Sequence, residues 1–246
     1  MDEYQEQFTR PKHNIFLYAL VIAVLGSFTY IAVIIYKGTQ TSTDDVIASI
    51  SDAYVHDLSI DSSGLGSLDS GANLETQDDP FFGSREAKVR IVEFGDFECP
   101  FCNQELTVIK QLQTRYGNQI FFQFRDFPVV TSHPNAFNAA IAATCAYEQG
   151  NEKFWLYHDR LYQFQDSLSD ELYASLAQRI GLDIQSFTSC YSQKTTSDEV
   201  EQDYLDGLDL GVTGTPTFFI NGSRVPGAIP FDIFVKVIDK LLDQPS

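Results

Sequence analysis

The pattern of apolar and polar positions divides the chain into parts with different characters. Residues 15–36 form an apolar run, 37–79 are rich in Ser, Thr, Gly and Asp, and 80–246 alternate between short β-branched runs and helical periodicities. Within the last part, residues 88–94 have the composition of a buried strand, and the apolar residues that follow recur at helical spacing. Residues 120–125 show a second strand pattern, so a right-handed βαβ unit is predicted.

Helical patterns dominate the next stretch, about residues 131–208, before the strand pattern returns. Five helices are predicted there by apolar spacing and by the breaks between them: 135–148, 153–164, 170–180, 184–190 and 196–210. The final part is predicted to contain two strands joined by an Asn-Gly hairpin turn, and then an amphipathic helix: 216–220, 223–225 and 231–242. The sequence therefore predicts an α/β domain whose sheet is interrupted by an all-helical insertion.

The apolar run at 15–36 contains 22 residues without a charge. At 1.5 Å per residue, such a helix is about 33 Å long, which is enough to cross a bilayer. Arg10 and Lys12 precede the run and only Lys37 follows closely, and positive charge marks the cytoplasmic side. The run is too long for the apolar part of a cleaved signal peptide. We therefore expect a single membrane anchor, with residues 1–14 in the cytoplasm and the remainder outside.

Composition and charge favour an extracytoplasmic linker over 37–79. No Lys or Arg occurs between residues 38 and 84, and the whole chain has a formal net charge of −18. A segment of this kind repels itself and stays extended from an anionic membrane. The charge also excludes nucleic acid as a partner, because few groups could neutralise its phosphates. Four cysteines, an even number, suit an oxidising compartment.

Candidate chemistry lies where the first strand passes into the first helix, at Cys99-Pro100-Phe101-Cys102. Free backbone N–H groups and the helix dipole favour the thiolate of Cys99, and thiols in such motifs titrate between about 3.5 and 7.5. Cys102, one helical turn on, can close a disulfide with Cys99. We expect solvent to reach Cys99, and Cys102 to lie beneath it, shielded by Phe101 and close to Glu93.

Two other interpretations of the motif are half of a zinc site and an inert structural disulfide. Zinc needs a second close pair of ligands, but Cys145, Cys190 and the four histidines are scattered along the chain. We therefore expect neither a metal nor an organic cofactor. Glu93 is a charged residue within an apolar strand, so it either is buried, at a cost unless protonated or paired, or faces outward from an edge strand.

Two segments, Phe-Gly-Asp-Phe-Glu-Cys-Pro-Phe-Cys at 94–102 and Thr-Gly-Thr-Pro-Thr-Phe-Phe-Ile-Asn-Gly at 213–222, together resemble the DsbA-like thiol–disulfide oxidoreductases of the thioredoxin superfamily. The resemblance runs from about residue 79 to 242. It implies a thioredoxin-like fold, βαβ…ββα with a helical insertion. It also implies that Glu93 relays protons to and from Cys102. Thr215-Pro216 matches the family's cis-proline element, at which a substrate strand can pair.

The residues expected to carry function follow from this motif and from the resemblance. The catalytic set is Cys99, Cys102, Glu93 and Pro216, and the groups expected beside the substrate are Thr215, Pro100 and Phe101. Cys145 and Cys190 lie in predicted helices without a neighbouring thiol, and some relatives have a cysteine pair in the insertion. A structural disulfide between them is expected, with two buried free thiols as the alternative.

The sequence thus predicts an anchored, extracytoplasmic enzyme that introduces disulfides into reduced or misfolded secreted proteins. The resemblance implies reoxidation by a quinone-linked membrane partner. Phe101 occupies a position where strongly oxidising relatives often have histidine, which leaves a reductase or isomerase as an alternative. A module that binds copper(I) through Cys99, Cys102 and His133 is a further alternative.

Overall fold

The computed structural model describes residues 74–243. The predicted tail, the membrane anchor at 15–36 and the linker as far as residue 73 lie outside the described residues. Within 74–243, none of the helices combines the length and apolar character that crossing a membrane requires.

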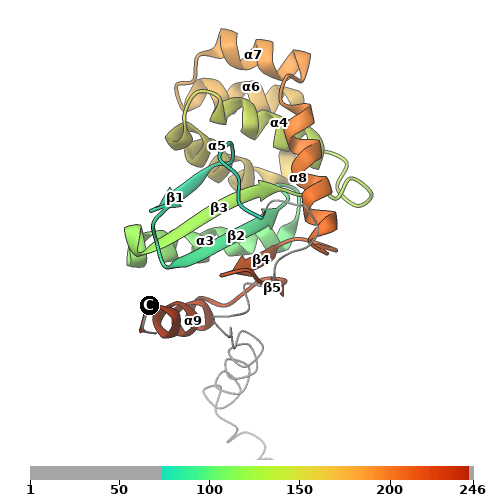
Figure 1. The fold of residues 1–246 in the computed structure, drawn as a ribbon. Helices are drawn as coiled ribbons and strands as arrows, with labels where there is room; N and C mark the ends of the chain where they lie inside the picture. The colour runs from blue at the N-terminus through green and yellow to red at the C-terminus, as the bar shows by residue number, and fades with distance from the viewer. Residues whose placement is uncertain (1–73, 244–246) are drawn as a thin grey trace, which may run out of the picture. The chain divides into compact units, whose positions relative to one another are not determined.

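A five-stranded mixed sheet forms the centre of the domain (Figure 1). Its strands, in order across the sheet, are β1 (Phe81–Gly83), β3 (Ile120–Asp126), β2 (Val89–Gly95), β4 (Thr217–Ile220) and β5 (Ser223–Pro226). β2 and β3 are parallel, and the other neighbouring pairs are antiparallel. Both central strands are almost wholly buried, which explains their near-continuous apolar sequences.

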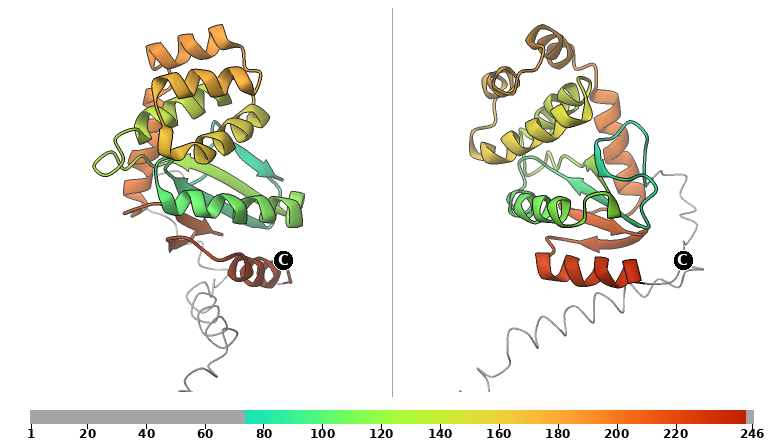
Figure 2. Two further views of the ribbon diagram at one scale, coloured as in Figure 1. Left: turned by 180° about the vertical axis from the view of Figure 1, so that it is seen from behind. Right: turned by 90° about the vertical axis from the view of Figure 1, so that its left-hand side faces the viewer.

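The two faces of β2 point to different layers. Val92 and Phe94 pack in a cluster with Phe127 and Phe219. Glu93 faces the other way, beside Phe218, whose ring contacts Phe234 of α9 (Phe231–Asp243). Two helices therefore cover the Glu93 face: α9 and α3 (Pro100–Tyr116), which connects β2 to β3. Figure 2 shows α3 and the insertion helix α8 on opposite sides of the sheet.

The insertion between β3 and β4 consists of five α-helices with short connections. These are α4 (Ala136–Tyr147), α5 (Asn151–Gln163), α6 (Asp170–Arg179), α7 (Ile184–Gln193) and α8 (Ser197–Asp209). The predicted helices match these, with ends that differ by a few residues. Phe154, Tyr157 and Tyr162 of α5 are buried in the core of the insertion. A disulfide joins Cys145 of α4 to Cys190 of α7, with Cα atoms 5.8 Å apart.

The hairpin between β4 and β5 turns where the Asn-Gly signal predicted. Asn221 and Gly222 have φ angles of 46° and 84°. A two-residue type I′ hairpin turn requires a positive φ at both positions. Sequence reasoning missed β1, which is only three residues long and pairs antiparallel with β3. A strand this short has too few positions to display an alternation.

Candidate active site

The two cysteines sit at the start of α3, as predicted. Cys99 is the N-cap residue, with extended backbone, and Pro100 begins the helix. The loop before the helix is held by hydrogen bonds: the Cys99 N–H donates to the Asp96 carbonyl at 3.1 Å. Gln165, from the insertion, donates through Nε2 to the Phe97 and Cys99 carbonyls at 2.8 and 2.9 Å. The helical insertion thus fixes the backbone of the motif, a role for which Gln165 gave no signal in the sequence.

Cys99 lies against the segment that precedes β4. Its Sγ is 3.2 Å from the Thr215 carbonyl oxygen, and the Thr215–Pro216 bond is cis. The pKa of Cys99 falls to about 5, chiefly because the Cys102 thiol donates a hydrogen bond to the Cys99 thiolate. The Thr215 hydroxyl and the backbone N–H groups of Phe101 and Cys102 add to this stabilisation. Cys99 is therefore ionised at neutral pH and able to act as the nucleophile.

Cys102 and Glu93 are shifted in the opposite direction. Burial raises the pKa of the Cys102 thiol well above its usual range, and the hydrogen bond to Cys99 and the charge of Glu93 contribute further. Burial likewise raises the pKa of Glu93, which is 3% exposed. Glu93 lies on β2, which is the central strand of the sheet, so the edge-strand alternative is wrong. A protonated carboxyl and a protonated thiol are therefore packed together beneath the nucleophile.

Two expectations about exposure are wrong. Phe101 is 57% exposed and points its ring to solvent, so Cys102 is shielded by the core instead. Cys99 is only 3% exposed, because the Thr215–Pro216 segment lies close against its sulfur. Cys102 occupies the inward-facing position in the first turn of α3, so the neighbouring ring of Phe101 projects outward. Pro100 is exposed next to Phe101, so both side chains are available to a protein that docks here.

His133 contacts a carboxylate and not the cysteines. Its Nδ1 lies 2.8 Å from Oδ2 of buried Asp96, which also accepts from the Val129 N–H. In the part of the chain that the structure describes, His133 does not join Cys99 and Cys102 in a cluster of potential metal ligands. The copper(I) alternative therefore lacks its third ligand.

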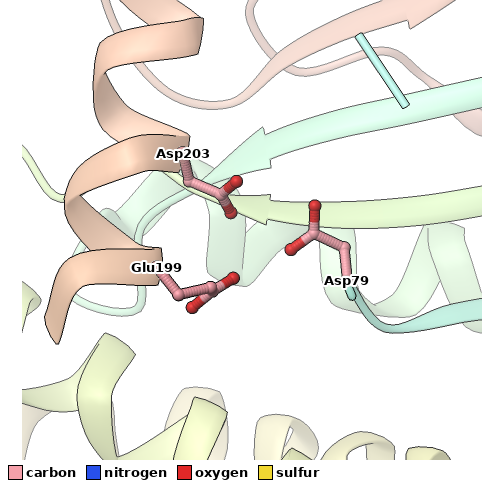
Figure 3. Close-up of side chains that lie close together, drawn as sticks. All are labelled: Asp79, Glu199 and Asp203. Atoms are coloured by element: carbon pink, nitrogen blue, oxygen red, sulfur yellow. The ribbon is translucent and has the colours of Figure 1, made fainter. Parts of the chain in front are cut away.

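The described residues contain one group of side chains with the spacing of metal ligands, Asp79, Glu199 and Asp203 (Figure 3). Their oxygen atoms lie within 4.8 Å of one another, and hard cations such as Ca²⁺ prefer such donors. However, the buried Arg125 already contacts two of the three: its Nε lies 3.1 Å from Asp79 and 2.8 Å from Asp203. A guanidinium thus supplies the positive charge in this cluster.

The fold and the paired cysteines define the class: a thioredoxin-like dithiol protein with a helical insertion. The family model described as thioredoxin matches residues 75–240. "Probable disulfide bond formation protein D" of Bacillus anthracis is 30% identical over 173 residues, which are 66% of this chain and 77% of that protein. The chain belongs to the thioredoxin family, in its DsbA-like branch of thiol–disulfide oxidoreductases.

Other similar proteins are of two kinds. "Na(+)/H(+) antiporter NhaA 1" of Salinispora arenicola is 38% identical over 164 residues, but the chain spans only about a quarter of that protein, 24% of its length. Two solved structures share the fold. Oxidised BdbD from Bacillus subtilis is 21% identical, with 70% of this chain and 97% of that chain covered. The thiol-disulfide exchange protein alpha-DsbA2 from Wolbachia pipientis is 24% identical, with 82% of this chain and 100% of that chain covered. Both structures have a TM-score of 0.63.

Proposed function

We propose that the domain donates its Cys99–Cys102 disulfide to reduced or misfolded secreted proteins. The observation that supports this most strongly is the opposite displacement of the two thiol pKa values, to about 5 for Cys99 and well above the usual range for Cys102. A thiolate that is stable at neutral pH is a good leaving group, so mixed disulfides on Cys99 are released readily. The same stability favours the reduced form of the domain over the disulfide.

The direction of exchange follows from linkage. The folded-state pKa of Cys99 is depressed from about 8.5, so the stabilisation is fully present above the unfolded pKa and is lost as pH falls through about 5. At pH 7, two units above the folded value, it amounts to at most about 2.7 kcal/mol. That free energy raises the reduction potential by about 60 mV relative to a pair of ordinary thiols. The domain is thereby biased towards oxidising its substrates.

The chemical steps balance without a cofactor. A substrate thiolate attacks Sγ of Cys99, the Cys99–Cys102 bond breaks, and Cys102 leaves and takes up a proton. A second substrate thiolate then attacks the substrate sulfur of the mixed disulfide, and Cys99 leaves as a thiolate. The substrate has been oxidised by two electrons and the domain reduced by two. Thr215 offers its backbone to an extended substrate next to the exposed Pro100 and Phe101.

A peptide with two cysteines tests the proposal. The oxidised domain should convert one equivalent of reduced peptide to its disulfide within minutes. Reduction of a peptide disulfide by the dithiol form, without measurable oxidation in the other direction, would favour the reductase or isomerase alternative. The assay needs only the described domain and no reoxidising partner. A quinone-linked membrane protein, which the family resemblance implies, belongs to the same proposal as the reoxidant.

The place of action is a further part of this proposal. The apolar run at 15–36 and its flanking charges support a single-pass anchor that leaves residues 37–246 outside the cytoplasm. Protease added to intact spheroplasts should then remove the folded domain. Protection of the domain until the membrane is permeabilised would contradict this topology.

A further inference from the structure

A second buried carboxyl group lies beneath the cysteine pair. Glu105 of α3 is only 3% exposed, and its Oε2 has no hydrogen-bond partner among the described residues. Burial of a carboxyl group with an unsatisfied oxygen is costly, and the steps described above make no use of it. A group retained at such a cost at a site of proton transfer is a candidate for a functional role.

Glu105 shares a small buried cluster with Cys102 and Glu93. It lies three residues after Cys102, so both side chains project from the same inward face of α3. Glu93 approaches from β2, on the sheet face that α3 and α9 cover. The charge of Glu105 is, after burial, the largest cause of the raised pKa of Glu93, so the two carboxyl groups interact electrostatically.

Glu105 also contacts a loop at the surface of the domain. The backbone N–H of Ile229 hydrogen-bonds to the Glu105 carboxylate and so contributes to its charged form. Ile229 belongs to the short loop between β5 and α9, in which Gly227 and Pro230 are exposed. Glu105 therefore extends from the neighbourhood of Glu93 to a loop at the surface.

We propose that Glu105 is the outer member of a two-carboxyl relay that moves the Cys102 proton between Glu93 and solvent. When Cys102 leaves as a thiolate, Glu93 gives it a proton, Glu105 restores the proton to Glu93, and water restores it to Glu105. When the domain is reoxidised, Glu93 gives its own proton to ionised Glu105 and takes up the proton of the Cys102 thiol, whose sulfur attacks the mixed disulfide on Cys99; Glu105 then releases its proton to water. Each transfer moves one proton, and no further reactant is required.

The titration of Glu105 suits this position. Burial raises the pKa of Glu105 to about 7, so its protonated and ionised forms coexist at neutral pH, and burial raises the pKa of Glu93 well above its usual range. The titratable groups around the cluster are Glu93 from β2, buried Asp96 from the loop before α3, Cys99 and Cys102 from the start of α3, and Tyr162 from α5. The buried face of α9 is apolar: Ile233, Phe234 and Val237.

The test is the rate at which the Cys99–Cys102 disulfide closes in the reduced domain, with oxidised glutathione as oxidant, between pH 5 and 9. Glu105→Gln keeps the size of the side chain and an acceptor for Ile229 but cannot carry the proton. We expect closure at pH 7 to slow by about tenfold or more, with loss of the inflection near pH 7. Glu105→Asp should restore part of the rate. The pKa of Cys99, followed by thiolate absorbance, should stay near 5 in both variants.

Two controls separate the relay from a structural effect. Glu201→Gln removes an exposed carboxyl group from α8 and should leave the rate unchanged. Glu93→Gln combined with Glu105→Gln should be no slower than Glu93→Gln alone, because groups in series do not add. An unchanged rate and pH profile in Glu105→Gln would overturn the relay, as would additive effects. The inference rests on the proposed function, but this assay uses the domain's own disulfide, so absence of peptide oxidation would refute the function and leave the relay measurable.

Discussion

Replacement of Cys99 by alanine is expected to lower the rate of peptide oxidation to that of the uncatalysed reaction. Cys99 carries the only ionised thiol of the pair at neutral pH, and its sulfur lies against the Thr215 carbonyl, where a substrate strand would pair. Without Cys99 no disulfide can form at the motif, and Cys102, which is 1% exposed with a raised pKa, cannot act in its place. The measurement is the peptide oxidation assay described above.

Replacement of Cys102 by alanine should give a different defect. The variant has no disulfide to donate, but its Cys99 thiolate can still attack a disulfide of an oxidised substrate. Because Cys102 is missing and cannot resolve the product, these mixed disulfides accumulate. Non-reducing electrophoresis and mass mapping should find the partners on Cys99. Residual turnover in Cys99→Ala, or alkylation of Cys102 before Cys99 at mildly acidic pH, would show that the roles are reversed.

The largest effect on stability is expected from Arg125→Met. Arg125 of β3 is 1% exposed, and its guanidinium contacts Asp79 before β1 and Asp203 and Asp206 of α8. Its removal leaves carboxyl groups buried without a cation, which typically costs about 3–5 kcal/mol. We expect a loss of this size in the free energy of unfolding at pH 7, measured with urea. Arg160→Met, which removes an exposed arginine of α5, should change it by less than about 1 kcal/mol.

The pH dependence of the stability loss in Arg125→Met distinguishes buried carboxyl groups without a cation from a packing defect. Burial raises the pKa of Asp203 already in the native domain, and loss of Arg125 raises it further. A carboxyl whose folded pKa is raised destabilises the fold progressively as pH rises above its unfolded value of about 4. The deficit of Arg125→Met should therefore be larger at pH 8 than at pH 5. An equal deficit at both values would indicate that the lost packing, and not the unpaired charge, is responsible.

Periodicity was sufficient for the main elements of the domain. The strands on either side of the motif and the five insertion helices have long, regular patterns, and the Asn-Gly pair marks its turn by a local requirement on φ. The position of Cys99 at a helix start also followed from sequence, because the dipole and the free N–H groups depend only on the local chain. The strand β1 has no such signal within three residues.

Features that depend on contacts between distant segments were not predictable in this way. Arg125 appeared as an ordinary polar residue at the end of a strand, and only the return of α8, some 80 positions later, supplies its partners. Gln165 reaches the motif from the insertion in the same manner. The outward ring of Phe101 and the buried carboxyl of Glu105 depend on the rotation of α3 against the sheet. The sequence spacing of α3 left that rotation undetermined.

The reduction potential of the Cys99–Cys102 pair tests the central claim most directly. We expect a value at pH 7 near −210 mV, about 60 mV above the potential of about −270 mV that a pair with an ordinary thiol would have, measured by equilibration with glutathione. Because one thiol is ionised above pH 5, the potential should fall by about 30 mV per pH unit above that value and by about 59 mV per unit below it. A potential near −270 mV, with a slope of 59 mV per unit through pH 7, would show that Cys99 is an ordinary thiol and that the domain is a reductant.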